Sequence, residues 1–387
     1  MEKLFKLKEH GTDVKTEIIA GITTFLAMAY ILAVNPSYLG GIDGMSAGAV
    51  FSATAISAGI ATLCMAFFAN YPVALASGMG LNAFFAFTVC GAMGYSYKVA
   101  LTAVFIEGII FMLLSLFKFR EALVNKIPSN LKFAITAGIG LFIAIIALLN
   151  ANVVVASEST TVALGELSSP TVVLSLVGLL IIGALQHYKV PGGILLGILI
   201  TWVLGIIAQL VGWYVPNPEA GVYSVIPQFS LSSFEAPKMF QFDFGFIAKN
   251  VPAFILIVFT FLYTDIFDTV GTLIGVAEKG KLLDKDGSLP NATGALMADA
   301  VGTVVGACLG TSTVTSYVES SAGVAAGGRT GLTAVTTAVL FFISLIFAPI
   351  FTSIPSFATT PAMLYVGLLM LSSIRQVKFD GDIADAI

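Results

Sequence analysis

The amino-acid sequence predicts an all-α polytopic membrane protein. Of its 387 residues, 57% are hydrophobic and only 10% are charged, whereas soluble domains carry about 25% charged residues. The mean hydropathy is +0.97. About a dozen apolar segments follow one another along the chain, each near the ~20 residues that a helix needs to cross a bilayer.

Two of these segments, the third and the tenth, do not read as continuous helices. The order of all segments is 16–38, 46–69, 71–93, 99–117, 131–149, 171–187, 192–214, 247–277, 292–309, 310–331, 332–351 and 357–374. Residues 215–246 are polar and contain four prolines, at 216, 218, 227 and 237, so we assign them to a loop.

Basic residues predict the orientation of the segments. Most of them precede the first segment or follow even-numbered segments, which places one side of the protein, including the N-terminus, in the cytoplasm. The loop 215–246 is then extracytoplasmic, and Lys98, Lys238 and Lys249 are the exceptions. The first residues are charged and read as a cytosolic tail rather than a signal peptide. We therefore expect a protein of the cytoplasmic membrane.

The tenth segment, residues 310–331, contains the strongest candidate site. Residues 311–318 are rich in Thr, Ser and Val, which favours extended backbone, and Ala and Gly dominate after Ser320. Glu319 lies at the join, where the N–H groups of a half-helix would favour a negative charge. Broken segments of this kind survive at membrane depth where they are buried in protein or line a cavity.

The eighth segment carries two acidic residues on one helix face. Asp265, Asp268, Thr269 and Thr272 recur at steps of three and four residues. Asp265, Asp268 and Glu319 form an acidic set, and no Lys or Arg occurs at the same depth. Each unpaired charge there costs about 2.5–3.5 kcal/mol on insertion scales. A neutral, hydrogen-bonding ligand and a travelling proton would satisfy these carboxylates. The alternative is that the acids bond only backbone or Thr hydroxyls between helices, and we favour it for Glu107 and Asp299.

The third segment supplies a polar counterpart to Glu319. It reads Ser77-Gly-Met-Gly-Leu-Asn82, where the small residues allow close backbone approach and the amide supplies both donor and acceptor. We add the backbone near Ala83 and Phe84 as a candidate contact. The alternative is that Asn82 only joins helices.

Composition excludes several other functions. The net charge of −4 does not indicate nucleic-acid binding, which would need clustered basic residues. The three cysteines are isolated and the two histidines stand alone, so we expect no metal site and no cofactor. An intramembrane aspartyl protease would need its two aspartates on facing helices, and Asp265 and Asp268 share one helix. An anion transporter would need a cation or a bare helix end where Glu319 stands.

The two halves of the chain predict an inverted repeat. In each half a full segment precedes a broken one, and the first segment corresponds to the eighth, so the halves would cross in opposite directions. Seven segments in each half would require two more than the sequence contains. We therefore expect that two C-terminal segments are absent.

These motifs resemble the AzgA-like purine permeases, which are relatives of the nucleobase/ascorbate transporters. The resemblance covers residues 4–387 and is carried by Ser77-Gly-Met-Gly-Leu-Asn-Ala-Phe-Phe-Ala, by Thr264-Asp-Ile-Phe-Asp-Thr-Val-Gly-Thr and by the stretch from Gly310 to Gly323 with Gly327-Gly-Arg-Thr-Gly-Leu-Thr. Such permeases are symporters of hypoxanthine, guanine and adenine with protons. The tenth-segment motif is the most specific of the three.

The resemblance implies fourteen segments in two inverted repeats, and short antiparallel strands that meet in segments three and ten. Residues 1–117 and 247–351 would form a core domain, and 131–214 with 357–387 an incomplete gate domain. The substrate would contact residues of both broken segments and of segment eight: Asp265, Glu319, Asn82, Ala83, Phe84, Tyr317 and Val318. The family also admits a homodimer.

The expected function is proton-coupled purine uptake by an elevator-type movement of core against gate. Hypoxanthine, guanine and adenine are the candidate substrates, with xanthine as a further one. Asp265, Asp268 and Glu319 are the candidates for the proton carrier. We expect no enzyme activity.

Overall fold

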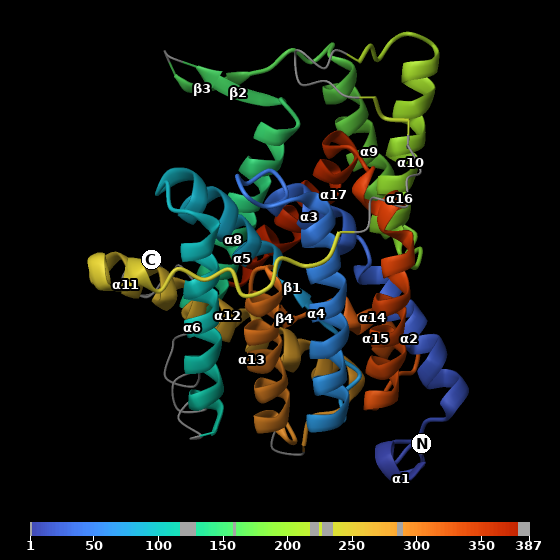
Figure 1. The fold of residues 1–387 in the computed structure, drawn as a ribbon. Helices are drawn as coiled ribbons and strands as arrows, with labels where there is room; N and C mark the ends of the chain where they lie inside the picture. Colours follow the sequence, from blue (N-terminus) through green and yellow to red (C-terminus); the bar gives the residue numbers. More distant parts are fainter. Residues whose placement is uncertain are drawn as a thin grey trace. The chain divides into compact units, whose positions relative to one another are not determined.

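The computed structural model describes residues 2–116, 129–157, 160–216, 224–226, 235–284 and 289–377. Parts of the predicted loop and gate, and several basic residues used for the orientation, lie outside the described residues. Within them, nine helical spans are long and apolar enough to cross a membrane, and Met79–Ala92 and Thr136–Asn150 are shorter apolar helices. The predicted class, a helical multi-pass membrane protein, is confirmed (Figure 1).

The chain divides into two compact units, each built from two separate stretches. The first unit comprises Met1–Ile127 and Phe234–Ala348, and the second comprises Pro128–Ser233 and Pro349–Ile387. The division assigns residues 234–246, which we predicted as part of a loop, to the first unit. Which unit binds substrate and which forms a gate stays a prediction.

The first unit contains the two interrupted segments. Its elements are α1 (Glu2–Phe5), α2 (Val14–Met28), α3 (Ile31–Leu39), α4 (Ala47–Phe68), β1 (Leu75–Ser77), α5 (Met79–Ala83), the π-helix η1 (Phe84–Ala92), α6 (Tyr97–Leu116), α11 (Gly245–Lys249), α12 (Val251–Gly280), α13 (Ala292–Leu309), β4 (Val314–Ser316), α14 (Ser320–Ala325), α15 (Gly331–Ser344) and η4 (Leu345–Phe347). Both halves of this unit run helix, helix, strand with short helix, helix. The inverted relation between them stays a prediction.

Strands β1 and β4 form the antiparallel pair that the resemblance implied. The two strands carry the labels β1 and β4 in Figure 1. Leu75 lies opposite Ser316 and Ser77 opposite Val314, and all six strand residues are buried. Hydroxyl side chains of the flanking helices complete the backbone bonding. The Thr62 hydroxyl contacts the carbonyl and N–H of Leu75, and the Thr303 hydroxyl donates to the Val314 carbonyl. A pair this short is stable at membrane depth because its backbone groups find partners inside the protein.

A carboxylate at the start of α2 organises the Gly-Gly-Arg-Thr-Gly-Leu-Thr motif. Glu17 is fully buried, and its two oxygens accept the backbone N–H groups of Arg329, Thr330 and Thr333 at 2.8, 3.3 and 3.0 Å. The Thr333 hydroxyl adds a fourth bond at 2.6 Å. These N–H groups lie in the first turn of α15 or directly before it, where few internal partners are available and a negative charge is favoured. The motif thus joins α2 to α15.

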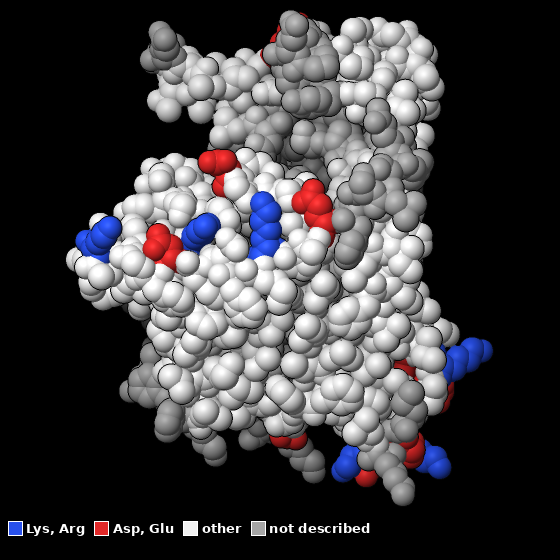
Figure 2. All heavy atoms as spheres, viewed as in Figure 1, with Lys and Arg blue, Asp and Glu red and all other residues white. Residues whose placement is uncertain are grey.

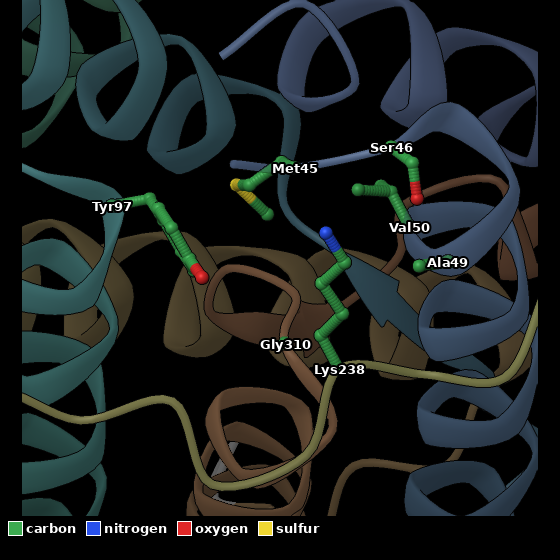
Figure 3. A pocket seen from close by; sticks show the side chains of 7 residues that line it. All are labelled: Met45, Ser46, Ala49, Val50, Tyr97, Lys238 and Gly310. Atoms are coloured by element: carbon green, nitrogen blue, oxygen red, sulfur yellow. The ribbon is translucent and has the colours of Figure 1, made fainter. Parts of the chain in front are cut away.

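An extended strap, defined here as residues 235–244, lies against one end of the first unit. The Lys238 amine donates to the Gly44 carbonyl at 2.8 Å, and the Ser52 hydroxyl donates to the Glu235 carbonyl at 2.6 Å. Gly310 adopts a φ of +91°, and a Cβ there would lie 2.8 Å from the Lys238 carbonyl oxygen. Figure 3 shows the Lys238 side chain reaching over a small pocket that Met45, Ser46, Ala49, Val50, Tyr97 and Gly310 also line.

The second unit is a smaller helical bundle with a hairpin that we did not predict. Its elements are α8 (Ser129–Asn150), β2 (Val154–Ser157), β3 (Thr161–Leu164), α9 (Pro170–His187), α10 (Gly193–Leu210), α16 (Ala348–Thr352, whose first residue belongs to the first unit), α17 (Ser356–Leu371) and η5 (Ser372–Gln376). Helices α8 and α17 approach closely, because a Cβ on Gly140 would lie 2.5 Å from the Gly367 carbonyl oxygen. Strands β2 and β3 pair antiparallel. The β-branched runs at 153–155 and 160–162 were the signal for this hairpin.

Charged side chains of the described residues are absent from the middle of one face of the first unit (Figure 2), although buried acids lie inside it. On the face seen in Figure 2, Lys, Arg, Asp and Glu gather at two levels, one at the strap and α11 and one near the N-terminus. A broad belt without charged groups separates them. Such a belt suits contact with the hydrocarbon core of a bilayer.

Candidate functional site

Glu319 lies at the junction predicted from sequence, but its side chain does not cap the half-helix. It is the N-cap residue of α14 and makes no side-chain cap bond. Its Oε1 instead accepts a hydrogen bond of 2.6 Å from the hydroxyl of Tyr30, a residue between α2 and α3. The neighbouring Ser320 hydroxyl accepts the N–H of Ala74, which joins the start of α14 to the chain before β1. The carboxylate is therefore held by the Tyr30 phenol and does not cap α14.

A cluster of polar groups surrounds Glu319. Asp268 and Tyr317 interact electrostatically with it, and Tyr38 interacts with both Tyr30 and Tyr317. Tyr38 is only 4% exposed, and its hydroxyl has no hydrogen-bond partner among the described residues. The ring of Tyr38 packs edge-on against Phe87, with centroids 5.4 Å apart. Hydroxyl and carboxyl groups thus lie near one another at one partly buried place.

Within the part of the chain that the structure describes, no Lys or Arg forms an ion pair with Glu319 or Asp268; the ion pair found there joins Lys6 and Glu9. Two neighbouring carboxylates without a cation are costly at membrane depth unless a proton or a hydrogen-bonding ligand satisfies them. Asp268, which sequence reasoning rated below Asp265, is the aspartate that interacts electrostatically with Glu319.

Asp265 is fully buried on α12 and faces strand β4 through a threonine pair. The Thr269 hydroxyl lies 3.5 Å from its Oδ1, and the same hydroxyl lies 2.7 Å from the Thr315 hydroxyl. Asp265 is thereby connected to the strand that leads directly to Glu319. Asp299, by contrast, accepts a bond of 2.9 Å from the Ser316 hydroxyl, which fits the structural role that we favoured for it.

Asn82 lies on α5, immediately after strand β1. Its side chain is fully buried, and its Oδ1 accepts a bond of 2.8 Å from the Ser77 hydroxyl. Its Nδ2 has no hydrogen-bond partner among the described residues. The Tyr317 hydroxyl donates to the Ser77 carbonyl at 2.6 Å. This bond joins the end of β1 to Tyr317, which lies two residues before Glu319.

The remaining candidates occupy different environments. Ala83 is buried inside α5, and the backbone N–H of Phe84 is used within the helix, where it donates to the Gly80 carbonyl. The ring of Phe84 packs edge-on against Phe261, with centroids 4.9 Å apart. Val318 is 58% exposed. The structure therefore brings together Glu319, Asp268 and Tyr317, and it places the Phe84 N–H in a helical bond instead of leaving it for a ligand.

Sequence reasoning missed Tyr30 and Tyr38, which come from the first segment. The available signal was their spacing: Tyr30 and Tyr38 are eight residues apart in an apolar segment, close to two helical turns, and Asn35 lies between them. Polar groups inside a membrane segment that share a face indicate a functional or structural contact. What they contact could not be read from the sequence.

Comparison with known proteins identifies the family. A model described as "Permease family" matches residues 15–382. The chain belongs to this permease family. It is 43% identical over 380 residues to the adenine permease AdeQ of Escherichia coli, covering 98% of this chain and 82% of that protein. It is 45% identical over 385 residues to the guanine/hypoxanthine permease PbuO of Bacillus subtilis, covering 97% and 85%.

A solved structure confirms the fold of this permease. The transmembrane domain of a cyanobacterial bicarbonate transporter, BicA, superimposes with a TM-score of 0.71 at 15% identity, covering 96% of this chain and 92% of that one. At that identity the likeness concerns the fold alone. Because the family consists of permeases, the chain is a transporter and not an enzyme, and the protease alternative is set aside.

Proposed function

We propose that this permease takes up purine nucleobases across the cytoplasmic membrane together with protons. Glu319 carries the proposal: it is a carboxylate at membrane depth, bonded by Tyr30 on one oxygen and without a cationic partner among the described residues. A carboxylate only accepts hydrogen bonds, so it suits a neutral ligand that donates N–H groups. The adenine and guanine/hypoxanthine permeases among its relatives support purines as that ligand.

Hypoxanthine, guanine and adenine are the proposed substrates, and xanthine is a further candidate. Glu319 would accept N–H groups of the base, and Asn82, beside the end of β1, would contact another edge. Asp265, Tyr317, Val318 and the backbone near Ala83 would complete the site. A flat base is compatible with the aromatic rings of this region.

A proton is the proposed coupling ion. Asp268 and Glu319 interact electrostatically, and a proton on one of them removes the repulsion between two carboxylates. Asp265 is the third candidate carrier. Neutralising the site in this way would allow it to cross the low-dielectric interior, which an unpaired charge opposes. No cofactor is needed for this coupling.

The proposed mechanism is alternating access of the elevator type. The first unit would act as the core that carries the base, and the second unit as the gate against which it moves. The N-terminus would face the cytoplasm, where the basic residues of the sequence concentrate. A homodimer is the assembly proposed on the resemblance alone.

Uptake into proteoliposomes tests the proposal. The purified protein is reconstituted with an inside-alkaline pH gradient, and accumulation of radiolabelled hypoxanthine, guanine and adenine is followed with and without a protonophore. We expect accumulation that the protonophore abolishes. Glu319→Gln and Asp265→Asn should each abolish accumulation at unchanged reconstitution yield, whereas Glu278→Gln, on the exposed end of α12, serves as the matched control. Normal accumulation in Glu319→Gln would refute the assignment of that residue.

An anion transporter is the second candidate, because the fold is shared with a bicarbonate transporter. The same vesicles distinguish the two. A purine carrier should be inhibited by unlabelled purines and unaffected by millimolar bicarbonate or chloride. Inhibition by either anion, with anion uptake in place of purine uptake, would favour the second candidate.

A further inference from the structure

A chain of buried polar side chains runs through the first unit and ends at Asn82. Its members are Asn35 on α3, Thr54 on α4, Thr311 before β4, Ser77 on β1 and Asn82 on α5, and all are fully buried. The nitrogen Nδ2 of Asn35 lies 2.7 Å from the Thr54 hydroxyl and 2.9 Å from the Thr311 hydroxyl. The Thr311 hydroxyl lies 3.3 Å from the Ser77 hydroxyl, which lies 2.8 Å from Oδ1 of Asn82.

The first end of this chain has a fixed direction. The Thr54 hydroxyl donates its one proton to the backbone carbonyl of Val50 at 2.7 Å. It can therefore only accept from Asn35, which requires the NH₂ face of that amide and not its oxygen. The two hydrogens of Nδ2 then point to Thr54 and Thr311. A backbone carbonyl thus sets which way the Asn35 amide is turned.

The direction continues from Thr311 to Asn82. Thr311 accepts a hydrogen bond from Asn35 and keeps its own hydroxyl proton. It can donate this proton to the Ser77 hydroxyl oxygen, which lies 3.3 Å away. Ser77 then donates its proton to Asn82. An atom that receives this proton must be the carbonyl oxygen of the amide. The Asn82 NH₂ group is left at the end of the chain, with no hydrogen-bond partner among the described residues.

We infer that this hydrogen-bond relay turns the Asn82 amide so that it presents donors, and that the transported base must offer it a hydrogen-bond acceptor. The acceptor is an unprotonated ring nitrogen or a carbonyl oxygen. Asn35, Thr311 and Ser77 are positioning residues, because they act on the base through Asn82. The inference rests on the proposed function and deepens it: Glu319 selects an edge that donates, and Asn82 selects an edge that accepts.

The structure offers a matched control for this relay. Thr337 on α15 is fully buried, like Thr311, and its hydroxyl lies 3.0 Å from the backbone carbonyl oxygens of Gly21 and Thr333, outside the relay. Thr54 cannot serve as the control, because its bond to Val50 fixes the Asn35 amide. Thr→Val replaces a hydroxyl by a methyl of similar size at either position. If the Thr311 hydroxyl served packing alone, Thr337→Val and Thr311→Val would affect the protein alike.

The experiment measures how strongly the site discriminates between bases that differ in one acceptor. Competition against radiolabelled hypoxanthine uptake in proteoliposomes gives inhibition constants for hypoxanthine, its 3-deaza, 7-deaza and 9-deaza analogues, and 6-mercaptopurine, which keeps the N1–H but has a weakly accepting sulfur in place of the carbonyl oxygen. In the wild type, the analogue without the acceptor that faces Asn82 should bind about tenfold more weakly. In Thr311→Val and Ser77→Ala this ratio should shrink by about two- to tenfold, the factor that one neutral hydrogen bond contributes. Thr337→Val should keep the wild-type ratio.

The outcomes separate the inference from the proposed function. A wild-type protein that neither binds nor transports any purine refutes the proposed function, and the inference falls with it. A wild-type protein that transports purines, with ratios unchanged in both Thr311→Val and Ser77→Ala, overturns the relay alone. Equal loss of discrimination in Thr337→Val also overturns it. Melting temperatures of the three variants, measured in detergent, show whether a variant has lost its fold, and Ser77→Ala decides the case if Thr311→Val does not fold.

Discussion

Replacing Glu17 by Gln should destabilise the protein strongly, although Glu17 is not part of the candidate site. The carboxylate is fully buried and accepts four hydrogen bonds from the start of α15. The amide of Gln has one oxygen and one NH₂ group. Whichever way it turns, the NH₂ group faces a donor: the Arg329 N–H on one side, or the N–H and hydroxyl of Thr333 on the other.

The magnitude follows from the less damaging orientation. With the amide oxygen towards Thr333, one bond is lost and the Arg329 N–H is left unsatisfied, which costs about 1–3 kcal/mol. The remaining bonds change from charged to neutral acceptors, and a bond to a charged group contributes up to about 1 kcal/mol more than a neutral one. Part of this loss is offset, because a neutral amide is easier to bury than a carboxylate. We therefore expect a loss of about 2–4 kcal/mol in the free energy of unfolding.

Thermal unfolding in detergent measures this change. The three free cysteines, Cys64, Cys90 and Cys308, are only partly exposed, so a thiol-reactive fluorophore reports unfolding. A loss of about 2 kcal/mol should lower Tm by roughly 2–3 °C or more, given about 2.1 cal/mol/K of unfolding entropy per residue. The control is Glu9→Gln, since Glu9 forms an exposed ion pair with Lys6, and exposed pairs contribute about 0–1 kcal/mol. If Glu17→Gln melts within about 1 °C of the wild type, the four bonds do not hold α15 and the reasoning is wrong.

Two further substitutions test the site and the half-helix. Tyr30→Phe removes the hydroxyl that donates to Glu319. Because a bond to a charged group contributes about 1.5–3 kcal/mol, the KM for purine uptake should change at least tenfold. A change below twofold in the proteoliposome assay would show that this bond does not serve the site. Gly323→Ala would place a Cβ 2.0 Å from the Thr24 hydroxyl oxygen, so α14 must move away from α2, and overpacking of about 1–3 kcal/mol should lower Tm. Gly183→Ala, where nothing lies within 4 Å of the added Cβ, is the control, and equal melting of the two variants would contradict the close approach.

Local patterns predicted the class of the protein and the places where its helices break. Hydropathy over about 20 residues is enough to identify a membrane segment, and the change from β-branched and hydroxyl residues to Ala and Gly at Ser320 located the junction between β4 and α14. The Asp265 and Asp268 face followed from helical spacing alone. Family resemblance then added the pairing of β1 with β4. The β2–β3 hairpin was missed because short runs of Val and Thr between long apolar segments gave a weak signal.

The partners of the polar residues were decided only by the tertiary structure. Tyr30 and Glu319 are 289 residues apart, and Asn35 and Thr311 are 276 apart. A segment's hydropathy says that a polar group needs a partner at membrane depth, but every helix in the bundle offers candidates. Close packing through glycines such as Gly323 decides which surfaces touch. The sequence therefore determined that acids without cations lie in a helical membrane protein, and the packing determined that a tyrosine holds one of them and that a chain of hydroxyls orients Asn82.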